Sequence, residues 1–256
     1  MPRLDGKVAI VTGSSGGIGR VTALRFAEEG ADLVLQYRSR KTEAEGVVSE
    51  ISRQGRKAVL SRVDFMNVTQ APGHVLMMVE EAIGEFGKVD ILVNLAGYQA
   101  RGEWNKKFLE LTPEDFFKPI NVDLYGSFLC ARAVAPHMLK QKKGVIANVS
   151  STPALAGHDK GLAFTVAKAG VIGLTKALAV ELAPYIRVNT IALGNVETEW
   201  LSELTNEESR AAREESLLKR LGTPEEVAEA LVFLCSDDSS FFTGQTIVLD
   251  GGGMLH

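Results

Sequence analysis

The sequence predicts one doubly wound α/β domain, residues 1–256, built on a mostly parallel seven-stranded sheet. Three observations predict this fold. Short apolar runs alternate with longer helical patterns along nearly the whole chain, as in strands joined by crossover helices. A glycine cluster follows the first apolar run directly. Finally, 256 residues with 45% hydrophobic content can bury a large core. Two smaller domains are the less favoured alternative.

Turn residues and helix-cap residues mark the predicted ends of the strands and helices. Each predicted strand is a short apolar run bounded by glycine or polar residues, and each helix carries apolar residues at helical spacing. The predicted strands are 8–11, 32–36, 58–63, 91–93, 145–149, 187–193 and 246–249. The predicted helices are 20–29, 42–54, 68–86, 112–139, 162–182 and 224–235. Thr112 with Pro113 marks a strong helix start, and Pro119 is expected to bend that helix.

The stretch TGSSGGIG, Thr12 to Gly19, joins the first strand to the first helix. Gly13 permits a tight turn, Gly17 lets the backbone approach a pyrophosphate, and Gly19 lets helix and strand pack closely. The unpaired amides and positive end of the helix face the anion. The motif therefore predicts a Rossmann-type dinucleotide site, although an ordinary strand-to-helix turn is the alternative for the string alone.

The strand ends that follow predict the other parts of this site. Arg38 lies just after the second strand with no acid at the strand end, which favours a 2′-phosphate and hence NADP(H) over NAD(H). Asp64 follows the third strand and either binds the adenine amino group or caps a helix. The turn NLAG, Asn94 to Gly97, is expected to form a second wall of the cleft.

Further polar residues interrupt apolar stretches. Asn121 stands between Ile120 and Val122 and is interpreted as a structural brace or part of a polar network below a site. Lys168 lies in the apolar helix 162–182 and needs an acceptor, such as ribose hydroxyls. Ser151 follows the fifth strand at the same rim. The polar segment 195–218 has the composition of a substrate lid.

Composition excludes several classes. The formal net charge of −4 gives no basic field for nucleic acid. The two cysteines, Cys130 and Cys235, lie in apolar segments, so neither a disulfide framework nor a metal site is expected and a reduced, cytoplasmic setting fits. No apolar run is expected to span a bilayer, and no membrane partner is predicted.

Taken together, TGSSGGIG, Asp64, NLAG, Asn121, Ser151 and Lys168 resemble the short-chain dehydrogenase/reductase family from about Leu4 to Gly252. Among its subfamilies the chain is most similar to bacterial 3-oxoacyl-acyl-carrier-protein reductases, including the closing GQTIVLDGG. The family pattern implies an Asn, Ser, Tyr and Lys tetrad with the tyrosine four residues before the lysine. That position holds Phe164. Ala167 and Leu193 are smaller departures, where serine and proline are common.

The resemblance implies roles that we state as expectations. The tetrad positions are Asn121, Ser151, Phe164 and Lys168. Residues expected to bind NADP(H) are Gly13, Ser15, Gly17, Ile18, Gly19, Arg38, Asp64, Asn94, Ala96, Gly97, Lys168, Gly194 and Val196. Residues expected to contact a small carbonyl substrate are Tyr98, Trp104, His158, Asn195 and Trp200. Homodimers or homotetramers are expected through helices 112–139 and 162–182.

The missing tyrosine leaves three outcomes open. A reductase persists with another proton source, for which Ser151, His158, Tyr98 or a water held by Lys168 are the alternatives. Alternatively, hydride passes to an activated acceptor such as an iminium, which needs little proton help. In the third outcome the chain binds NADP(H) without turnover, as a subunit or sensor. A structural α/β domain without nucleotide is a remote fourth interpretation.

Overall fold

The computed structural model describes residues 2–99, 102–199 and 205–255. Its strands are β1 (Val8–Val11), β2 (Asp32–Tyr37), β3 (Ala58–Arg62), β4 (Ile91–Asn94), β5 (Gly144–Ser151), β6 (Ile186–Leu193) and β7 (Thr246–Leu249). Its α-helices are α1 (Gly17–Glu28), α2 (Lys41–Arg53), α3 (Ala71–Phe86), α4 (Pro113–Pro119), α5 (Gly126–Gln141), α6 (Pro153–Ala156), α7 (Leu162–Leu182), α8 (Asn206–Glu214) and α9 (Pro224–Cys235). Short 3₁₀ turns η1 (Phe108–Glu110) and η4 (Asp237–Ser239) and a π-helical turn η2 (Ile120–Tyr125) complete the elements.

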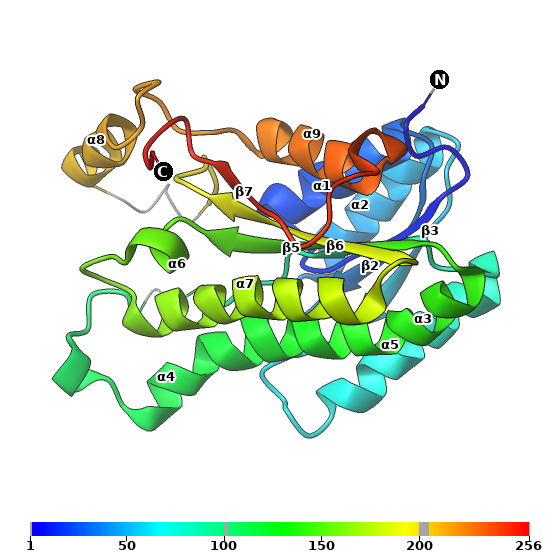
Figure 1. Cartoon of the computed structure of the whole chain (residues 1–256), viewed down its shortest axis with the longest axis horizontal. Helices are drawn as coiled ribbons and strands as arrows, with labels where there is room; N and C mark the ends of the chain where they lie inside the picture. The colour runs from blue at the N-terminus through cyan, green and yellow to red at the C-terminus, as the bar shows by residue number, and fades with distance from the viewer. Residues whose placement is uncertain (1, 100–101, 200–204, 256) are drawn as a thin grey trace.

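The strands form one seven-stranded sheet in the order β3-β2-β1-β4-β5-β6-β7, and every pairing is parallel. Helices α1, α2 and α9 cover one face of the sheet, and α3, α5 and α7 cover the other (Figure 1). Strands β1, β2 and β4 are almost wholly buried apolar runs because both faces of the sheet are covered. The predicted doubly wound α/β fold is confirmed.

The order of the strands places the functional rim. The chain runs outward from β1 to β3, then returns to the centre with β4 and runs outward the other way to β7. The crevice at that reversal, outside the carboxyl ends of β1 and β4, is the usual ligand site of such sheets. The glycine turn and the NLAG turn follow these two strands, so the fold brings both predicted walls together.

The predicted helix 112–139 is divided in the structure. Thr112 caps α4 by accepting a hydrogen bond from the Asp115 amide at 3.2 Å, as its sequence indicates. At Pro119 the α-helix gives way to η2, and α5 resumes at Gly126. Proline has no amide hydrogen for the helical ladder, which favours such a change of hydrogen-bonding pattern. The helix therefore changes its hydrogen-bonding pattern at the residue where a bend was predicted, and the bend itself stays a prediction.

Helix α7 requires one correction concerning membranes. Residues Leu162–Leu182 are long and apolar enough to cross a bilayer by length and composition, with a mean hydropathy of 1.5. The expectation that no apolar run has this property is wrong for this helix. In the fold, however, α7 packs against β5, β6 and η2, and it buries Val171 and Ile172. This is the packing of a core helix in an α/β sheet.

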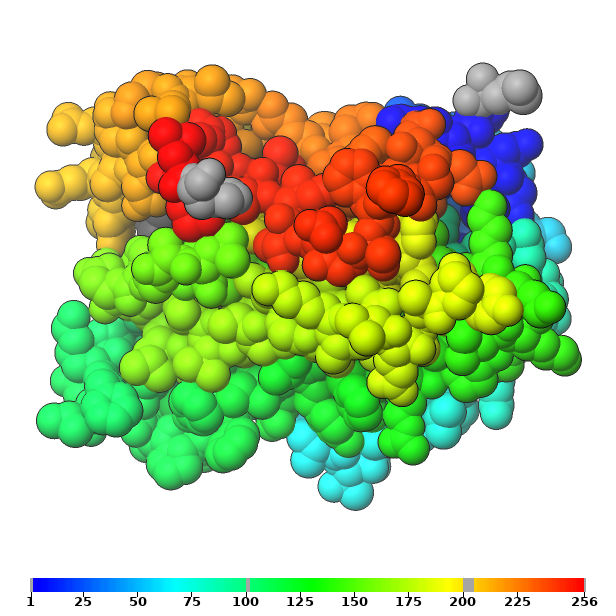
Figure 2. All heavy atoms as spheres, viewed as in Figure 1, coloured from blue at the N-terminus to red at the C-terminus, as the bar shows by residue number. Residues whose placement is uncertain are grey.

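The C-terminal segment closes the molecule beside the segment that follows α8. Figure 2 shows these last residues lying against that segment, next to α7. The Leu218 amide donates to the Gly251 carbonyl at 3.2 Å, and Gly252 adjoins the Leu217 side chain. The end of the chain thus supports the base of the predicted lid.

Candidate active site

The glycine turn between β1 and α1 has the space that a phosphate group needs. Gly13 has φ +69° and Gly17 has φ +52°, both in the left-handed region that favours glycine. A Cβ on Gly17 would meet nothing within 4 Å, whereas one on Gly19 would lie 2.2 Å from the Gly13 carbonyl oxygen. The N-cap of α1 is Gly16, and among the described residues no N-cap side chain bonds the first turn, which leaves its amides suited to an anion. These features fit a dinucleotide pyrophosphate.

Two polar side chains hold this turn against its neighbours. The Thr12 hydroxyl accepts hydrogen bonds from the amides of Leu95 and Ala96, both at 2.9 Å. The Gln36 side chain accepts from the Gly13 amide at 2.8 Å and donates to the Val63 carbonyl at 2.7 Å. The turns after β1, β3 and β4 are therefore fixed relative to one another before any ligand binds.

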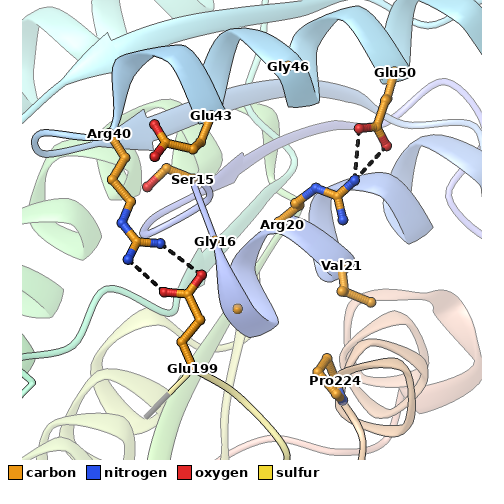
Figure 3. A pocket seen from close by; sticks show the side chains of 11 residues that line it. Ser15, Gly16, Arg20, Val21, Arg40, Glu43, Gly46, Glu50, Glu199 and Pro224 are labelled. Carbon is orange, nitrogen blue, oxygen red and sulfur yellow. Dashed lines mark hydrogen bonds and ion pairs between the residues drawn. The ribbon is translucent and has the colours of Figure 1, made fainter. Parts of the chain in front are cut away.

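The arginine that reaches the glycine turn is Arg40, which the sequence did not single out. A Cβ on Gly16 would lie 3.0 Å from Arg40 Nη1. The guanidinium forms a two-pronged ion pair with Glu199, at 3.0 and 2.6 Å (Figure 3). This pairing raises the pKa of Arg40. Arg40 and Glu199 line a cavity of about 680 Å³ together with Ser15, Gly17 and Arg20.

Arg38 and Asp64 lie at the strand ends where the sequence puts them. Arg38 is exposed immediately after β2, and its proposed contact with a 2′-phosphate stays a prediction. Asp64 follows β3, and its carboxylate accepts a hydrogen bond from the Met66 amide at 3.0 Å. That bond closes a turn and does not cap a helix, because α3 begins only at Ala71, so the helix-cap interpretation of Asp64 is wrong; a contact with adenine stays a prediction.

Asn94 braces the site from inside the sheet. Its side chain is buried and donates to Asn148 Oδ1 at 2.8 Å, and Asn148 in turn donates to Thr175 Oγ1 at 2.8 Å. The side chain therefore belongs to a buried polar network, and a contact of Asn94 with the cofactor stays a prediction. Ala96 and Gly97 remain at the rim, where Gly97 adjoins Asp123 and Lys168.

Lys168 has its amine buried beneath this rim. Its Nζ donates to the Val149 carbonyl at 3.0 Å and forms an ion pair with Asp123 Oδ1 at 2.8 Å. Asp123 Oδ2 accepts a hydrogen bond from the Tyr98 amide at 2.9 Å. The side chains of Asp123 and Lys168 are 0% and 9% exposed, so this pair is almost removed from water.

The side chain of η2 that meets Lys168 is thus Asp123, and the tetrad role of Asn121 stays a prediction. Asn121 is half-buried at the start of η2, and among the described residues its side chain forms no hydrogen bond with Lys168 or Ser151. Asp123 lies in the π-helical turn, where the side-chain spacing differs from that of an α-helix. An acid inside an otherwise apolar helix, next to a predicted buried lysine, was the available signal.

Phe164 occupies the tyrosine position and lies among aromatic rings. Trp104 packs edge-on against Phe164 with ring centroids 5.6 Å apart, and against His158 at 5.5 Å. Lys168 Nζ is 5.6 Å from the centre of the Phe164 ring. The structure therefore brings Trp104, His158 and Phe164 together, as the sequence predicts for one side of a substrate site.

The other predicted substrate and proton-donor residues are already engaged. The Ser151 hydroxyl donates to the Leu193 carbonyl at 3.1 Å, and the Tyr98 hydroxyl to Glu103 at 3.2 Å. Burial raises the pKa of Tyr98, which makes its hydroxyl a weaker acid. Asn195 donates to Glu215 at 2.6 Å, so its side chain connects β6 to the end of α8. Trp200 lies outside the described residues.

Gly194 and Val196 form the exit from β6. A Cβ on Gly194 would lie 2.6 Å from Cβ of Asp250, so the close approach of the segment after β7 requires glycine here. Val196 is buried and pairs with Gly222 in an isolated bridge. Gly194 directly precedes the predicted lid and Val196 lies at its start, but their contact with a cofactor stays a prediction.

Comparison with known proteins agrees with this architecture. Residues 13–254 match the family model described as Enoyl-(Acyl carrier protein) reductase. The chain is 39% identical to the (2S)-[(R)-hydroxy(phenyl)methyl]succinyl-CoA dehydrogenase subunit BbsD of Thauera aromatica and 38% identical to the 3-oxoacyl-[acyl-carrier-protein] reductase FabG of Thermotoga maritima. Each alignment covers 98% of both chains. A short-chain type dehydrogenase/reductase from Mycobacterium marinum superposes with TM-score 0.89 at 34% identity, covering 99% of this chain and 97% of the other.

The fold and the alignments define an oxidoreductase with a parallel sheet and a glycine turn at its ligand crevice. The chain belongs to the short-chain dehydrogenase/reductase family. The predicted resemblance, fold class and oxidoreductase class are confirmed.

Proposed function

We propose that this protein is an NADP(H)-dependent reductase of a small carbonyl compound in which proton delivery is slow. The observation that supports the proposal is the shared rim: the open glycine turn and the buried amine of Lys168 both adjoin the NLAG turn. A nicotinamide cofactor, when bound, supplies the hydride. Named relatives act on acyl-carrier-protein and CoA esters, which suggests an acyl thioester ketone as the substrate class.

The chain's own groups divide the work. Gly13, Gly17 and the first amides of α1 would hold the pyrophosphate. Arg40 would pair with a 2′-phosphate, because its guanidinium already reaches the glycine turn. Lys168 would hold the nicotinamide ribose. Trp104 and Phe164 would exclude water on one side of the substrate.

Proton delivery is the step that Phe164 weakens. A phenyl ring has no proton for the alkoxide that forms when hydride reaches a ketone, and a positioned general acid is typically worth about 10²- to 10⁴-fold in rate. Ser151 and Tyr98 donate their protons elsewhere, and His158 is exposed. Val149 and Asp123 account for two of the three N–H directions of Lys168. The third is left for the nicotinamide ribose, so a water bound beside Lys168 is the proton source we favour.

Restoring the tyrosine tests the proposal. NADPH oxidation is followed with a panel of ketones and acyl thioesters for the native protein, Phe164→Tyr, and the control Phe117→Tyr on an exposed part of α4. We expect slow native turnover, a gain of at least about tenfold for Phe164→Tyr, and no gain for the control. Native turnover that Phe164→Tyr leaves unchanged contradicts the proposed proton limitation.

A non-catalytic NADP(H)-binding subunit is the second candidate. Two residues at the reactive end favour it: Phe164 has no proton, and Asp123 offsets the charge of Lys168. The Thauera relative is itself named a dehydrogenase subunit. A native protein that binds NADPH but is inactive with every ketone, while Phe164→Tyr turns over, supports this candidate instead.

Assembly and location complete the proposal. Apolar side chains of α5 and α7 are exposed, including Phe128 and Leu139 on α5 and Val166 and Val180 on α7. A homodimer or homotetramer through these helices would cover them. Size-exclusion chromatography with light scattering tests this. A cytoplasmic location agrees with two free, buried cysteines.

A further inference from the structure

The buried pair of Asp123 and Lys168 sets the charge of the reactive end of the cleft. Both side chains are almost completely withdrawn from water, and their charged atoms lie 2.8 Å apart. Asp123 is also fixed by the Tyr98 amide, so its two oxygens contact one cation and one neutral donor. A charge in such surroundings is costly unless it is compensated nearby, and each member of this pair compensates the other.

The other described groups that contact the pair carry no formal charge. The Val149 carbonyl accepts from Lys168, the Phe164 ring faces its amine, and Gly97 adjoins both residues. Ser150 donates to the Lys168 backbone carbonyl at 2.9 Å. Seen from the cleft, the positive charge of Lys168 is therefore opposed by an adjacent negative charge, and their field falls off faster than that of a single cation.

We propose that Asp123 is a positioning residue that keeps the reactive end electrically neutral, so that the site tolerates the cationic, oxidised nicotinamide better than Lys168 alone would allow. The inference rests on the proposed function, because it requires a nicotinamide cofactor beside Lys168. An oxidised nicotinamide ring carries a positive charge and a reduced ring does not. An uncompensated Lys168 would thus repel only the oxidised form.

The proposal has a second consequence at position 164. A lone ammonium near a phenol favours loss of its proton, whereas an adjacent carboxylate opposes that effect. A tyrosine introduced at position 164 would therefore remain a weaker acid while Asp123 is present. Changing both Phe164→Tyr and Asp123→Asn should lower the apparent pKa in the pH profile of kcat below that of Phe164→Tyr alone.

The test compares the affinities of one protein for NADP⁺ and NADPH, because their ratio cancels the contacts that both forms share. NADPH binding is measured by its fluorescence and NADP⁺ binding by competition. Asp123→Asn keeps the shape of the side chain and removes its charge. The matched control is Asp115→Asn, which removes another buried carboxylate, one paired with Lys106 and Lys118.

We expect Asp123→Asn to raise the ratio of the Kd for NADP⁺ to that for NADPH by about three- to tenfold. Asp115→Asn should leave the ratio unchanged, and the neutral double variant Asp123→Asn with Lys168→Gln should restore it to within about twofold of the native value. Thermal unfolding verifies that each variant is folded.

A ratio that stays native in folded Asp123→Asn overturns the proposal. If that variant fails to fold, Lys168→Gln tests the same charge balance from the other side. It leaves Asp123 negative and should lower the ratio of the Kd for NADP⁺ to that for NADPH. An unchanged or raised ratio in this variant overturns the proposal. A native protein that binds neither NADP⁺ nor NADPH contradicts the proposed function itself, so the two failures are distinguishable.

Discussion

Arg40 gives the most direct test of the cofactor end, through Arg40→Gln. Its guanidinium lies at the glycine turn and is paired with the Glu199 carboxylate, at 2.6 and 3.0 Å. A hydrogen bond to a charged group is worth about 1.5–3 kcal/mol. At about 1.4 kcal/mol for each factor of ten, Arg40→Gln should weaken NADPH binding about 10- to 100-fold. NADH has no 2′-phosphate and should change less than about threefold.

Glu199 opposes that contact because a phosphate must displace it. The two side chains are 43% and 57% exposed, so the ion pair belongs to the surface class, worth about 0.2–1 kcal/mol. Glu199→Gln should therefore strengthen NADPH binding, by at most about fivefold. Added salt should reduce this gain, because salt screens charges exposed to water.

Calorimetric titration of NADPH and NADH into these variants checks both expectations. Arg38→Gln is the matched comparison, since Arg38 is the arginine that the sequence predicts for the phosphate. A loss of NADPH affinity in Arg38→Gln with none in Arg40→Gln would refute the assignment to Arg40. If a variant loses the same affinity for NADPH as for NADH, the arginine that it replaces does not recognise the 2′-phosphate.

Three further predictions concern the scaffold. Gly19→Ala places a methyl group 2.2 Å from a loop carbonyl; we expect a cost of about 1–3 kcal/mol in unfolding free energy and loss of NADPH binding, measured by thermal unfolding with and without NADPH. The ion pair with Arg220 lowers the pKa of Glu226 to about 2 from 4.5. The stability that ionised Glu226 contributes is therefore complete above pH 4.5 and is lost as the pH falls towards 2. Glu226→Gln should make the free energy of unfolding in urea depend less on pH between 4.5 and 2, and an unchanged pH dependence contradicts this. Burial raises the pKa of the Cys130 and Cys235 thiols to about 12, so a thiol reagent should label neither until urea unfolds the chain; rapid labelling of native protein contradicts their burial.

The fold was predictable because its signals are local and repeated. Apolar strands, glycine after β1 and the proline-marked starts of α4 and α9 each act over a few residues, and together they agree with one topology. The glycine turn was predictable for the same reason. Gly13 and Gly17 have positive φ, and a Cβ on Gly19 would lie 2.2 Å from the Gly13 carbonyl oxygen, so glycine is strongly favoured at all three positions.

The side chains of the site were less predictable because their positions depend on tertiary geometry. Asp123, in the π-helical turn η2, lies against Lys168, whereas the residue that the sequence pattern favoured for the tetrad is Asn121, two positions earlier. Arg40 stands farther along the chain than Arg38, yet its guanidinium reaches the glycine turn. Asn94 is at the predicted rim but its side chain turns inward to Asn148. Each difference concerns which way a side chain faces, which spacing alone does not give.

The two ends of the crevice therefore carry different constraints. At the phosphate end, backbone amides would bind the ligand and glycines leave room for it. The turn that joins β1 to α1 therefore also forms the binding surface. At the reactive end the chemistry depends on side chains: Phe164 has no proton to donate and Asp123 offsets the charge of Lys168, and neither residue lies on a strand of the sheet. Binding and proton transfer can thus vary separately in this fold, and measurements of cofactor affinity and of turnover will each report on one end.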